Sequence, residues 1–248
     1  MKLENIIATR KAKTIYREGN QTVKIYDEDS KVDVLSQALT HALIEETGIK
    51  VPKMLDVTTK EGKMTIIYEY IVGETLDVLM ERYPEKEDEY LDMFLKLQMS
   101  IHEKRAPGLK KLRDKMRAKI SISSLSDTVK YDLHVRLTSM PKHEKICHGD
   151  FNPSNIVITE SGEAYVIDWA HATQGNASAD VARTYLLFCL DGKEALAEKY
   201  LNLFCEKSGT TRAYVQKWLP IVAASQSVKN IPKEAELLHK WIDVVEFE

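Results

Sequence analysis

The first part of the chain shows the alternation of apolar and polar residues that is typical of β-strands. Residues 22–26 form such a run. Residues 13–17 and 64–71 are also β-prone and read as strands, the second of them ending before Gly73. Between them, apolar residues recur every three or four positions over residues 34–43, which predicts an amphipathic helix. We therefore expect a small unit with the order strand, helix, strand.

The rest of the chain is mostly helical in its pattern. An apolar stripe runs along residues 90–101, and residues 180–248 contain several further stripes with Leu, Tyr and Trp. His102 closes the first of these helices, and we interpret it as a structural histidine. The pattern predicts an α+β protein with a β-rich N-lobe, residues 1–73, and a larger, mainly helical C-lobe, residues 74–248.

Two charged runs interrupt this helical part. Residues 110–119 contain six Lys and Arg side chains, and residues 81–92 are rich in Asp and Glu. A basic run attracts phosphate or nucleic acid in some proteins, but no aromatic residues are interleaved with this one. We interpret the basic run as a solvated helix face, and the acidic run as a solubilising loop and helix start.

Composition changes this picture little. The 248 residues are 44% hydrophobic with a net charge of −3, which is ordinary globular material for one large domain or two lobes. This charge demands neither nucleic acid nor an anionic membrane as a partner. No apolar run is long enough to span a bilayer, the N-terminus lacks a signal-peptide core, and the three Cys form no C-x-x-C pair. We expect a cytoplasmic protein without nucleic-acid or membrane partners; the sequence does not determine its oligomeric state.

Candidate catalytic and metal-binding side chains are concentrated in residues 148–169. Two apolar β-prone runs, 156–159 and 164–167, flank a short turn that contains Gly, and this predicts a β-hairpin. A hairpin returns Asp168 close to Asn155. The oxygen atoms of these two side chains suit a hard cation such as Mg²⁺.

Asp150 precedes this hairpin. Four residues separate it from Asn155, which is the spacing of Asp and Asn in the kinase catalytic loop H-R-D-x-x-x-x-N. We therefore expect Asp150 to orient an acceptor hydroxyl and to take its proton.

The segments His148-Gly149-Asp150-Phe151-Asn152-Pro153-Ser154-Asn155 and Ile167-Asp168-Trp169 resemble the H-G-D-x-x-x-x-N and I-D-W signatures of one superfamily. It is the aminoglycoside phosphotransferase and choline kinase superfamily of small-molecule kinases, and its bacterial aminoglycoside phosphotransferase-like branch is the most similar. Asp180-Val181-Ala182-Arg183-Thr184 also resembles the helix start of that branch. The resemblance implies a bilobal protein-kinase-like fold, Mg²⁺, and ATP or GTP as the phosphoryl donor. The acceptor would be a hydroxyl of a small molecule, namely an amino-sugar, an amino alcohol or a sugar.

The resemblance also assigns roles in the C-lobe. Asp150 would be the catalytic base, and Asn155 and Asp168 would hold the metal. His148 would brace the catalytic loop through hydrogen bonds. Asp180 would anchor the following helix to that loop.

In the N-lobe, the resemblance concerns the nucleotide. Lys24 would reach the α- and β-phosphates from its strand. Tyr68 would occupy the gatekeeper position, and the backbone of Glu69 and Ile71 would pair with the edge of the base. Gln37 stands where these kinases have a lysine-pairing Glu; it accepts hydrogen bonds but brings no charge. Alternative partners for the lysine are Asp33, Glu45 and Glu46.

A second departure concerns the phosphate loop. Residues 8–14 stand where kinases have a Gly-rich loop, and they contain no Gly. Their basic side chains Arg10, Lys11 and Lys13 would supply positive charge instead.

These departures support an alternative hypothesis, a pseudokinase-type nucleotide-binding or interaction module with little or no turnover. The presence of Asp150, Asn155 and Asp168 together favours the enzyme. A protein kinase is disfavoured because no A-P-E segment follows Asp168. The acceptor stays open; acidic residues that would suit an amino-sugar are Glu194, Glu198, Glu234, Glu236, Asp243 and Glu246.

Overall fold

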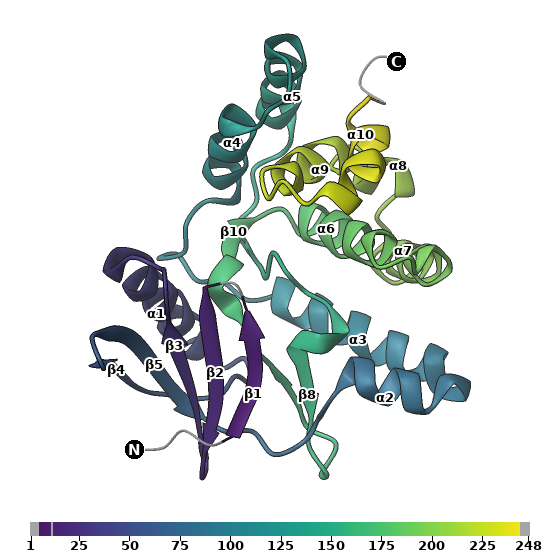
Figure 1. Cartoon of the computed structure of the whole chain (residues 1–248). Coiled ribbons are helices and arrows are strands. Elements are labelled where there is room, and N and C mark those ends of the chain that lie inside the picture. The colour runs from purple at the N-terminus through teal and green to yellow at the C-terminus, as the bar shows by residue number, and fades with distance from the viewer. Residues whose placement is uncertain (1–4, 11, 244–248) are drawn as a thin grey trace. The chain divides into compact units, whose positions relative to one another are not determined.

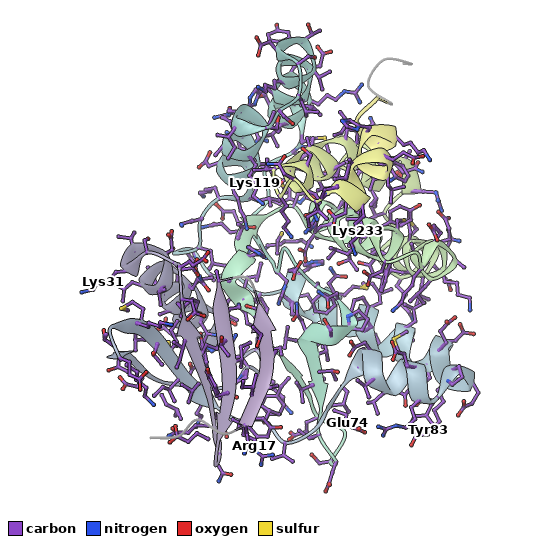
Figure 2. All side chains as sticks on the ribbon, in the orientation of Figure 1. Arg17, Lys31, Glu74, Tyr83, Lys119 and Lys233 are labelled. Carbon is purple, nitrogen blue, oxygen red and sulfur yellow. The ribbon has the colours of Figure 1, made fainter. Side chains whose placement is uncertain are left out.

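The computed structural model describes residues 5–10 and 12–243 (Figure 1), with side chains drawn in Figure 2. Lys11 and Glu246 therefore lie outside the described residues. No helix in these ranges has the length and apolar character required to cross a membrane.

The chain forms two compact units. The first runs to Pro84 and also contains Pro153–Ala170, whereas the second contains Glu85–Asn152 and resumes at His171. The lobe boundary expected after residue 73 stays a prediction. The compact units divide the chain differently, because the segment with the predicted hairpin belongs with the N-terminal strands.

The first unit is built on an antiparallel sheet with the strand order β1-β2-β3-β5-β4 (Figure 1). The strands expected from the alternating pattern are all present. The pattern did not predict the first strand. The strands are β1 (Asn5–Arg10), β2 (Lys13–Glu18), β3 (Gln21–Tyr26), β4 (Met54–Lys60) and β5 (Lys63–Glu69).

Helix α1 (Lys31–Glu45) confirms the predicted amphipathic helix. Ser30 caps its start by accepting a hydrogen bond from the Asp33 N–H. The helix packs on the sheet through a buried cluster that includes Val34, Ala38 and Ile66. This apolar contact is what fixes the helix on one face of the strands, since propensity alone seldom holds a helix of this length.

A second, three-stranded sheet of order β6-β8-β9 completes the first unit. Gly73 precedes it, and a Cβ on that residue would collide with the Ile158 carbonyl oxygen. Gly is therefore required where the chain passes from the segment after β5 into β6. The elements are β6 (Glu74–Thr75), α2 (Leu76–Arg82), β8 (Ile156–Ile158) and β9 (Ala164–Val166), with a 3₁₀ turn η2 (Pro153–Asn155).

The second unit is mainly helical. Helix α6 (Ala177–Leu190) is buried along most of its length and packs against α7, α8 and α9 (Figure 1). Its other helices are α3 (Glu87–His102), α4 (Leu112–Ile122), α5 (Asp127–Ser139), α7 (Glu194–Ser208), α8 (Arg212–Gln216), α9 (Leu219–Ser227) and α10 (Ala235–Asp243). The short strands β7 (Lys145–Cys147) and β10 (Thr173–Gly175) pair antiparallel; further 3₁₀ turns are η1 (Pro84–Lys86), η3 (Trp169–His171) and η4 (Pro232–Glu234).

Candidate functional site

The hairpin of β8 and β9 brings Asn155 and Asp168 together in the first unit. Ile156 pairs with Val166, and the Ile167 N–H donates to the Asn155 carbonyl oxygen at 2.9 Å. The predicted hairpin is thereby confirmed. Asp168 has φ of 61°, a left-handed conformation that costs a residue with a Cβ about 1 kcal/mol or more. Such strain is frequent at functional sites, and here it falls on the residue expected to bind the metal.

A pocket of about 440 Å³ lies wholly within the first unit. This is the size of a typical small-molecule site. The five-stranded sheet, the segment after β5 and the hairpin all contribute to its walls. Among the residues that line it are seven expected in the nucleotide and metal site, namely Lys24, Gln37, Tyr68, Glu69, Ile71, Asn155 and Asp168.

Two lysines face the Asp168 carboxylate in this pocket. The Nζ atom of Lys13 lies 3.3 Å from Oδ2, and that of Lys24 lies 3.8 Å from Oδ1. Burial lowers the pKa of Lys24, and the neighbouring charge of Asp168 offsets part of this effect. Lys13 belongs to the stretch without Gly, so a cationic side chain from that stretch does reach the pocket.

Gln37 lines the same pocket, but its side chain forms hydrogen bonds with residues other than Lys24. Its Oε1 accepts a hydrogen bond from the Tyr26 hydroxyl at 3.2 Å, and its Nε2 donates to Asp29 Oδ2 at 3.5 Å. The charged partner of Lys24 is Asp168. Of the alternative partners, Asp33 accepts from the Ser30 hydroxyl and Glu45 from the Met54 N–H.

Tyr68 and the two residues proposed to meet the base form one wall. The Tyr68 side chain is buried, and its ring meets His41 edge-on at 4.7 Å between centroids. The Glu69 N–H donates to the Lys53 carbonyl oxygen at 2.9 Å. Within the part of the chain that the structure describes, the Ile71 N–H makes no hydrogen bond. It is therefore available to a ligand in the pocket.

Asn155 and Asp168 fit a hard divalent cation. Both side chains offer oxygen, and both line the pocket beside the two lysines. The described residues contain no cluster of three or more His, Cys, Asp or Glu that would hold a metal unaided. Mg²⁺ commonly takes one or two carboxylates as protein ligands and completes its shell with phosphate oxygens and water.

The segment of residues 148–152, expected to be part of the catalytic loop, follows β7 in the second unit, and Asp180 holds it. Asp180 Oδ1 accepts from the Gly149 N–H at 2.7 Å, and Oδ2 accepts from the His148 N–H at 3.2 Å. Oδ2 also lies 3.1 Å from His102 Nε2. Gly149 has φ of 77°, and a Cβ there would lie 2.7 Å from the His171 carbonyl oxygen. The loop therefore needs both the carboxylate and the Gly.

Asp150 has a cationic neighbour that the sequence reasoning missed. Arg183 Nη2 lies 3.7 Å from Asp150 Oδ1. His148 Nδ1 accepts from the Asp150 N–H at 3.2 Å and so orients the residue. The sequence offered one indication of this role for Arg183. It lies three residues after Asp180 and therefore on the same face of the helix.

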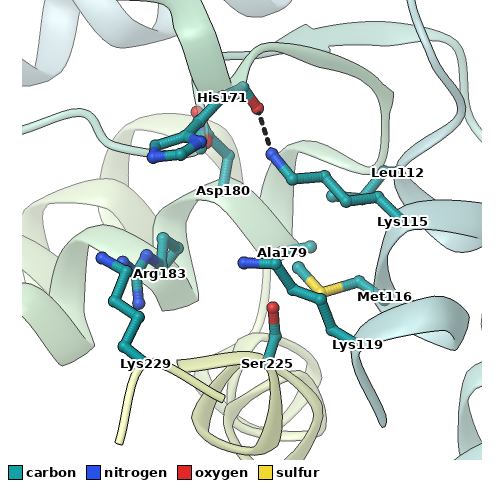
Figure 3. A pocket seen from close by; sticks show the side chains of 11 residues that line it. Leu112, Lys115, Met116, Lys119, His171, Ala179, Asp180, Arg183, Ser225 and Lys229 are labelled. Atoms are coloured by element: carbon teal, nitrogen blue, oxygen red, sulfur yellow. Dashed lines mark hydrogen bonds between the residues drawn. The ribbon is translucent and has the colours of Figure 1, made fainter. Parts of the chain in front are cut away.

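The interpretation of residues 110–119 as a solvated face is wrong for two lysines. Lys115 and Lys119 of α4 line a pocket of the second unit together with Arg183 and Lys229 (Figure 3). Lys115 Nζ donates to the His171 carbonyl oxygen at 2.7 Å. Helical spacing predicts that the two lysines lie on one face of α4. Which residues that face contacts depends on the packing of α4 on α9, which the sequence pattern does not show.

Comparison with known proteins agrees with this architecture. The structure superposes on an aminoglycoside phosphotransferase APH(4)-Ia in ternary complex with AMP-PNP and hygromycin B with a TM-score of 0.71 at 16% identity, covering 97% of this chain and 92% of that one. It also superposes on choline kinase LicA from Streptococcus pneumoniae (TM-score 0.68, 13% identity, 99% and 95% coverage). A choline/ethanolamine kinase family protein from Mesorhizobium loti gives a TM-score of 0.63 at 15% identity, with 99% and 85% coverage.

These likenesses show the fold, which is the bilobal kinase-like α+β fold expected from the sequence. None of the curated proteins matches the chain significantly in sequence. The model of the phosphotransferase enzyme family matches residues 11–218, which is most of the chain. By that match, the chain belongs to the phosphotransferase enzyme family.

Proposed function

We propose that the protein is a Mg²⁺-dependent kinase that transfers the γ-phosphoryl group of a nucleoside triphosphate to a hydroxyl of a small molecule. The observation that carries this proposal is the convergence of Lys24, Asn155 and Asp168 on one pocket of nucleotide size. Family membership supports the same reaction class.

The nucleotide would occupy the pocket of the first unit. Its base would lie against Tyr68 and bind the backbone of Glu69 and Ile71. Lys24 and Lys13 would bind the phosphates, because the ammonium groups of both side chains lie close to the Asp168 carboxylate. Mg²⁺, bound by Asn155 and Asp168, would neutralise charge on the phosphates.

Asp150 would act on the acceptor. It orients the hydroxyl and takes its proton while the oxygen forms a bond to the γ-phosphorus. The bond from that phosphorus to the bridging oxygen of the β-phosphate breaks, so the products are a nucleoside diphosphate and a phosphomonoester. Asp180 and His148 would keep the loop in position through the hydrogen bonds to its backbone.

The first experiment is titration of ATP and of GTP in the presence of Mg²⁺, with wild-type protein and Asp168→Ala. Metal-dependent binding that Asp168→Ala weakens supports the proposal, and the preferred nucleotide identifies the donor. A screen of phosphoryl transfer to amino-sugars, amino alcohols and sugars follows. Binding without turnover on any acceptor would favour the pseudokinase alternative, which the missing Gly-rich loop and Gln37 motivate. Absence of nucleotide binding would refute the kinase.

A further inference from the structure

The second unit contains a strongly basic pocket beside the catalytic loop. Lys115 and Lys119 enter it from α4, Arg183 from α6, and Lys229 from the segment after α9 (Figure 3). Arg183 also lies 3.7 Å from Asp150, so the pocket adjoins the proposed base. All of these groups belong to the second unit.

The cations of this pocket exceed the carboxylates near them. Asp180 is the one carboxylate among the described lining residues, and its oxygens already receive the N–H groups of the catalytic loop. In the described chain, Lys119 and Lys229 have no carboxylate within ion-pair distance. With the three lysines in their charged forms, and with Asp150 and Glu234 counted as neighbours of Arg183, one positive charge is left over. A bound anion would balance this excess of positive charge.

The hydroxyl of Ser225 is a further hydrogen-bond donor in this pocket, besides the Lys and Arg side chains. Ser225 of α9 is buried, and its side chain points into the pocket between Lys119 and Lys229 (Figure 3). Among the described residues, its Oγ has no hydrogen-bond partner. Donors therefore approach from three elements, α4, α6 and the end of α9, which suits the three acceptor oxygens of a phosphate group better than a planar carboxylate.

We propose that the acceptor of this kinase is a small phosphorylated alcohol, whose phosphate group binds Lys115, Lys119, Arg183 and Lys229 while its free hydroxyl meets Asp150. This rests on the kinase function proposed above and names its substrate class. The product is a bisphosphate: the new bond joins the acceptor hydroxyl oxygen to the γ-phosphorus, and the existing phosphate is unchanged. The pocket has a free volume of about 30 Å³, more than the roughly 10–15 Å³ that one water needs, so it accommodates an end group and not a whole sugar ring.

Cationic acceptors fit this pocket poorly. Quaternary ammonium groups are bound by aromatic rings, and no described residue that lines the pocket is Phe, Tyr or Trp. Three of the acidic residues that would suit an amino-sugar are engaged elsewhere. Glu198, Glu234 and Glu236 bind Arg212, Gln226 and Lys240, respectively, and Glu246 lies outside the described residues.

The pKa values of Lys115 and Lys119 reflect burial and the crowding of cations in this pocket. Burial, together with the neighbouring cations, lowers the pKa of Lys115 to about 7 and that of Lys119 to about 8. A bound phosphate would reverse this mutual repulsion and favour the charged amines. The titratable and charged groups that face them are His171, Asp150, Asp180, Arg183, Lys229 and Glu234.

The test is calorimetric titration of glycerol 3-phosphate, glycerol, glycerate and choline into the full chain without nucleotide. Variants are Lys119→Gln and Lys229→Gln, with Arg117→Gln as the control, because Arg117 is an exposed cation on the same helix. We expect glycerol 3-phosphate to bind and each pocket variant to raise its Kd about 10- to 100-fold, as for a lost charge-assisted hydrogen bond. Arg117→Gln should leave that Kd unchanged. Thermal unfolding of each variant checks that it is folded.

Turnover separates this inference from the kinase itself. With Mg²⁺-nucleotide present, sugar phosphates such as ribose 5-phosphate should release nucleoside diphosphate faster than ribose, glycerate or choline. Turnover with the neutral, carboxylate or cationic acceptors alone would overturn the proposed acceptor class and leave the kinase intact. Equal Kd values for wild type and both pocket variants would overturn the phosphate site. Failure of nucleotide to bind would refute the kinase, while the phosphate titration would still decide the function of the pocket.

Discussion

The substitution Asp180→Asn tests how the catalytic loop is held. Asp180 is buried, and its two oxygens accept hydrogen bonds from the backbone N–H groups of His148 and Gly149 and from the Gln98 side chain. Burial alone would raise the pKa of the Asp180 carboxyl, but the hydrogen bonds and the charge of His102 outweigh it, and the pKa lies below its usual range. The side chain is therefore an anion at neutral pH. Asn has the same shape but offers only one accepting oxygen.

The size of the effect follows from the donors. If the Asn oxygen keeps the Oδ2 position, its NH₂ group faces the Gly149 N–H, which loses the 2.7 Å hydrogen bond. Losing a hydrogen bond to a charged group and burying its donor costs roughly 1.5–3 kcal/mol. For a chain of this length, each kcal/mol lowers Tm by about 2–4 °C, so Tm should fall by about 3–12 °C. A misplaced loop should also lower kcat about 10- to 100-fold.

Calorimetry and steady-state kinetics measure these two effects. The matched control is Asp56→Asn, an exposed residue of β4, which should change stability by less than about 0.5 kcal/mol. Because the folded-state pKa of Asp180 is depressed, its stabilisation is complete above about pH 4 and is lost at lower pH. The difference between wild type and variant should shrink in acid. An Asp180→Asn protein with wild-type Tm and kcat at pH 7 would refute the reasoning.

Three further outcomes are expected. Asp150→Asn should lower kcat about 10²- to 10⁴-fold and leave the nucleotide Kd unchanged by titration; wild-type turnover would exclude Asp150 as the base. Lys24→Met should raise the nucleotide Kd about 10- to 100-fold, whereas the same change at exposed Lys31 should not; equal Kd values would remove Lys24 from the phosphate site. The acceptor KM should rise as pH increases through 7 and 8, because Lys115 and then Lys119 lose their protons; a flat profile over that range would contradict their role in binding the acceptor.

Local sequence pattern was sufficient to predict much of the proposed nucleotide site. The β8–β9 hairpin could be predicted because two β-prone runs flank a turn with Gly162, and the hairpin by itself returns Asp168 to Asn155. Lys24 could be placed on a strand by alternation, and α1 by its helical period. These features depend on residues close in sequence, so their geometry is encoded locally.

The local sequence pattern did not predict which side chains those residues contact. The expected partner of Lys24 was Gln37 or, alternatively, Asp33, Glu45 or Glu46. In the structure Lys24 pairs with Asp168, and Gln37 binds Tyr26 and Asp29. The pairing depends on the rotation of α1 on the sheet. That rotation is set by the apolar cluster beneath the helix and not by the polar positions themselves.

The basic pocket shows the same division between sequence and tertiary structure. The sequence determined that Lys115 and Lys119 share a helix face and that Arg183 follows Asp180 on another helix. Only the tertiary structure decided that α4, α6 and the end of α9 bring these cations into one pocket beside Asp150. Helical periodicity sets which side chains share a face, whereas the packing of buried apolar residues far apart in sequence sets what that face meets.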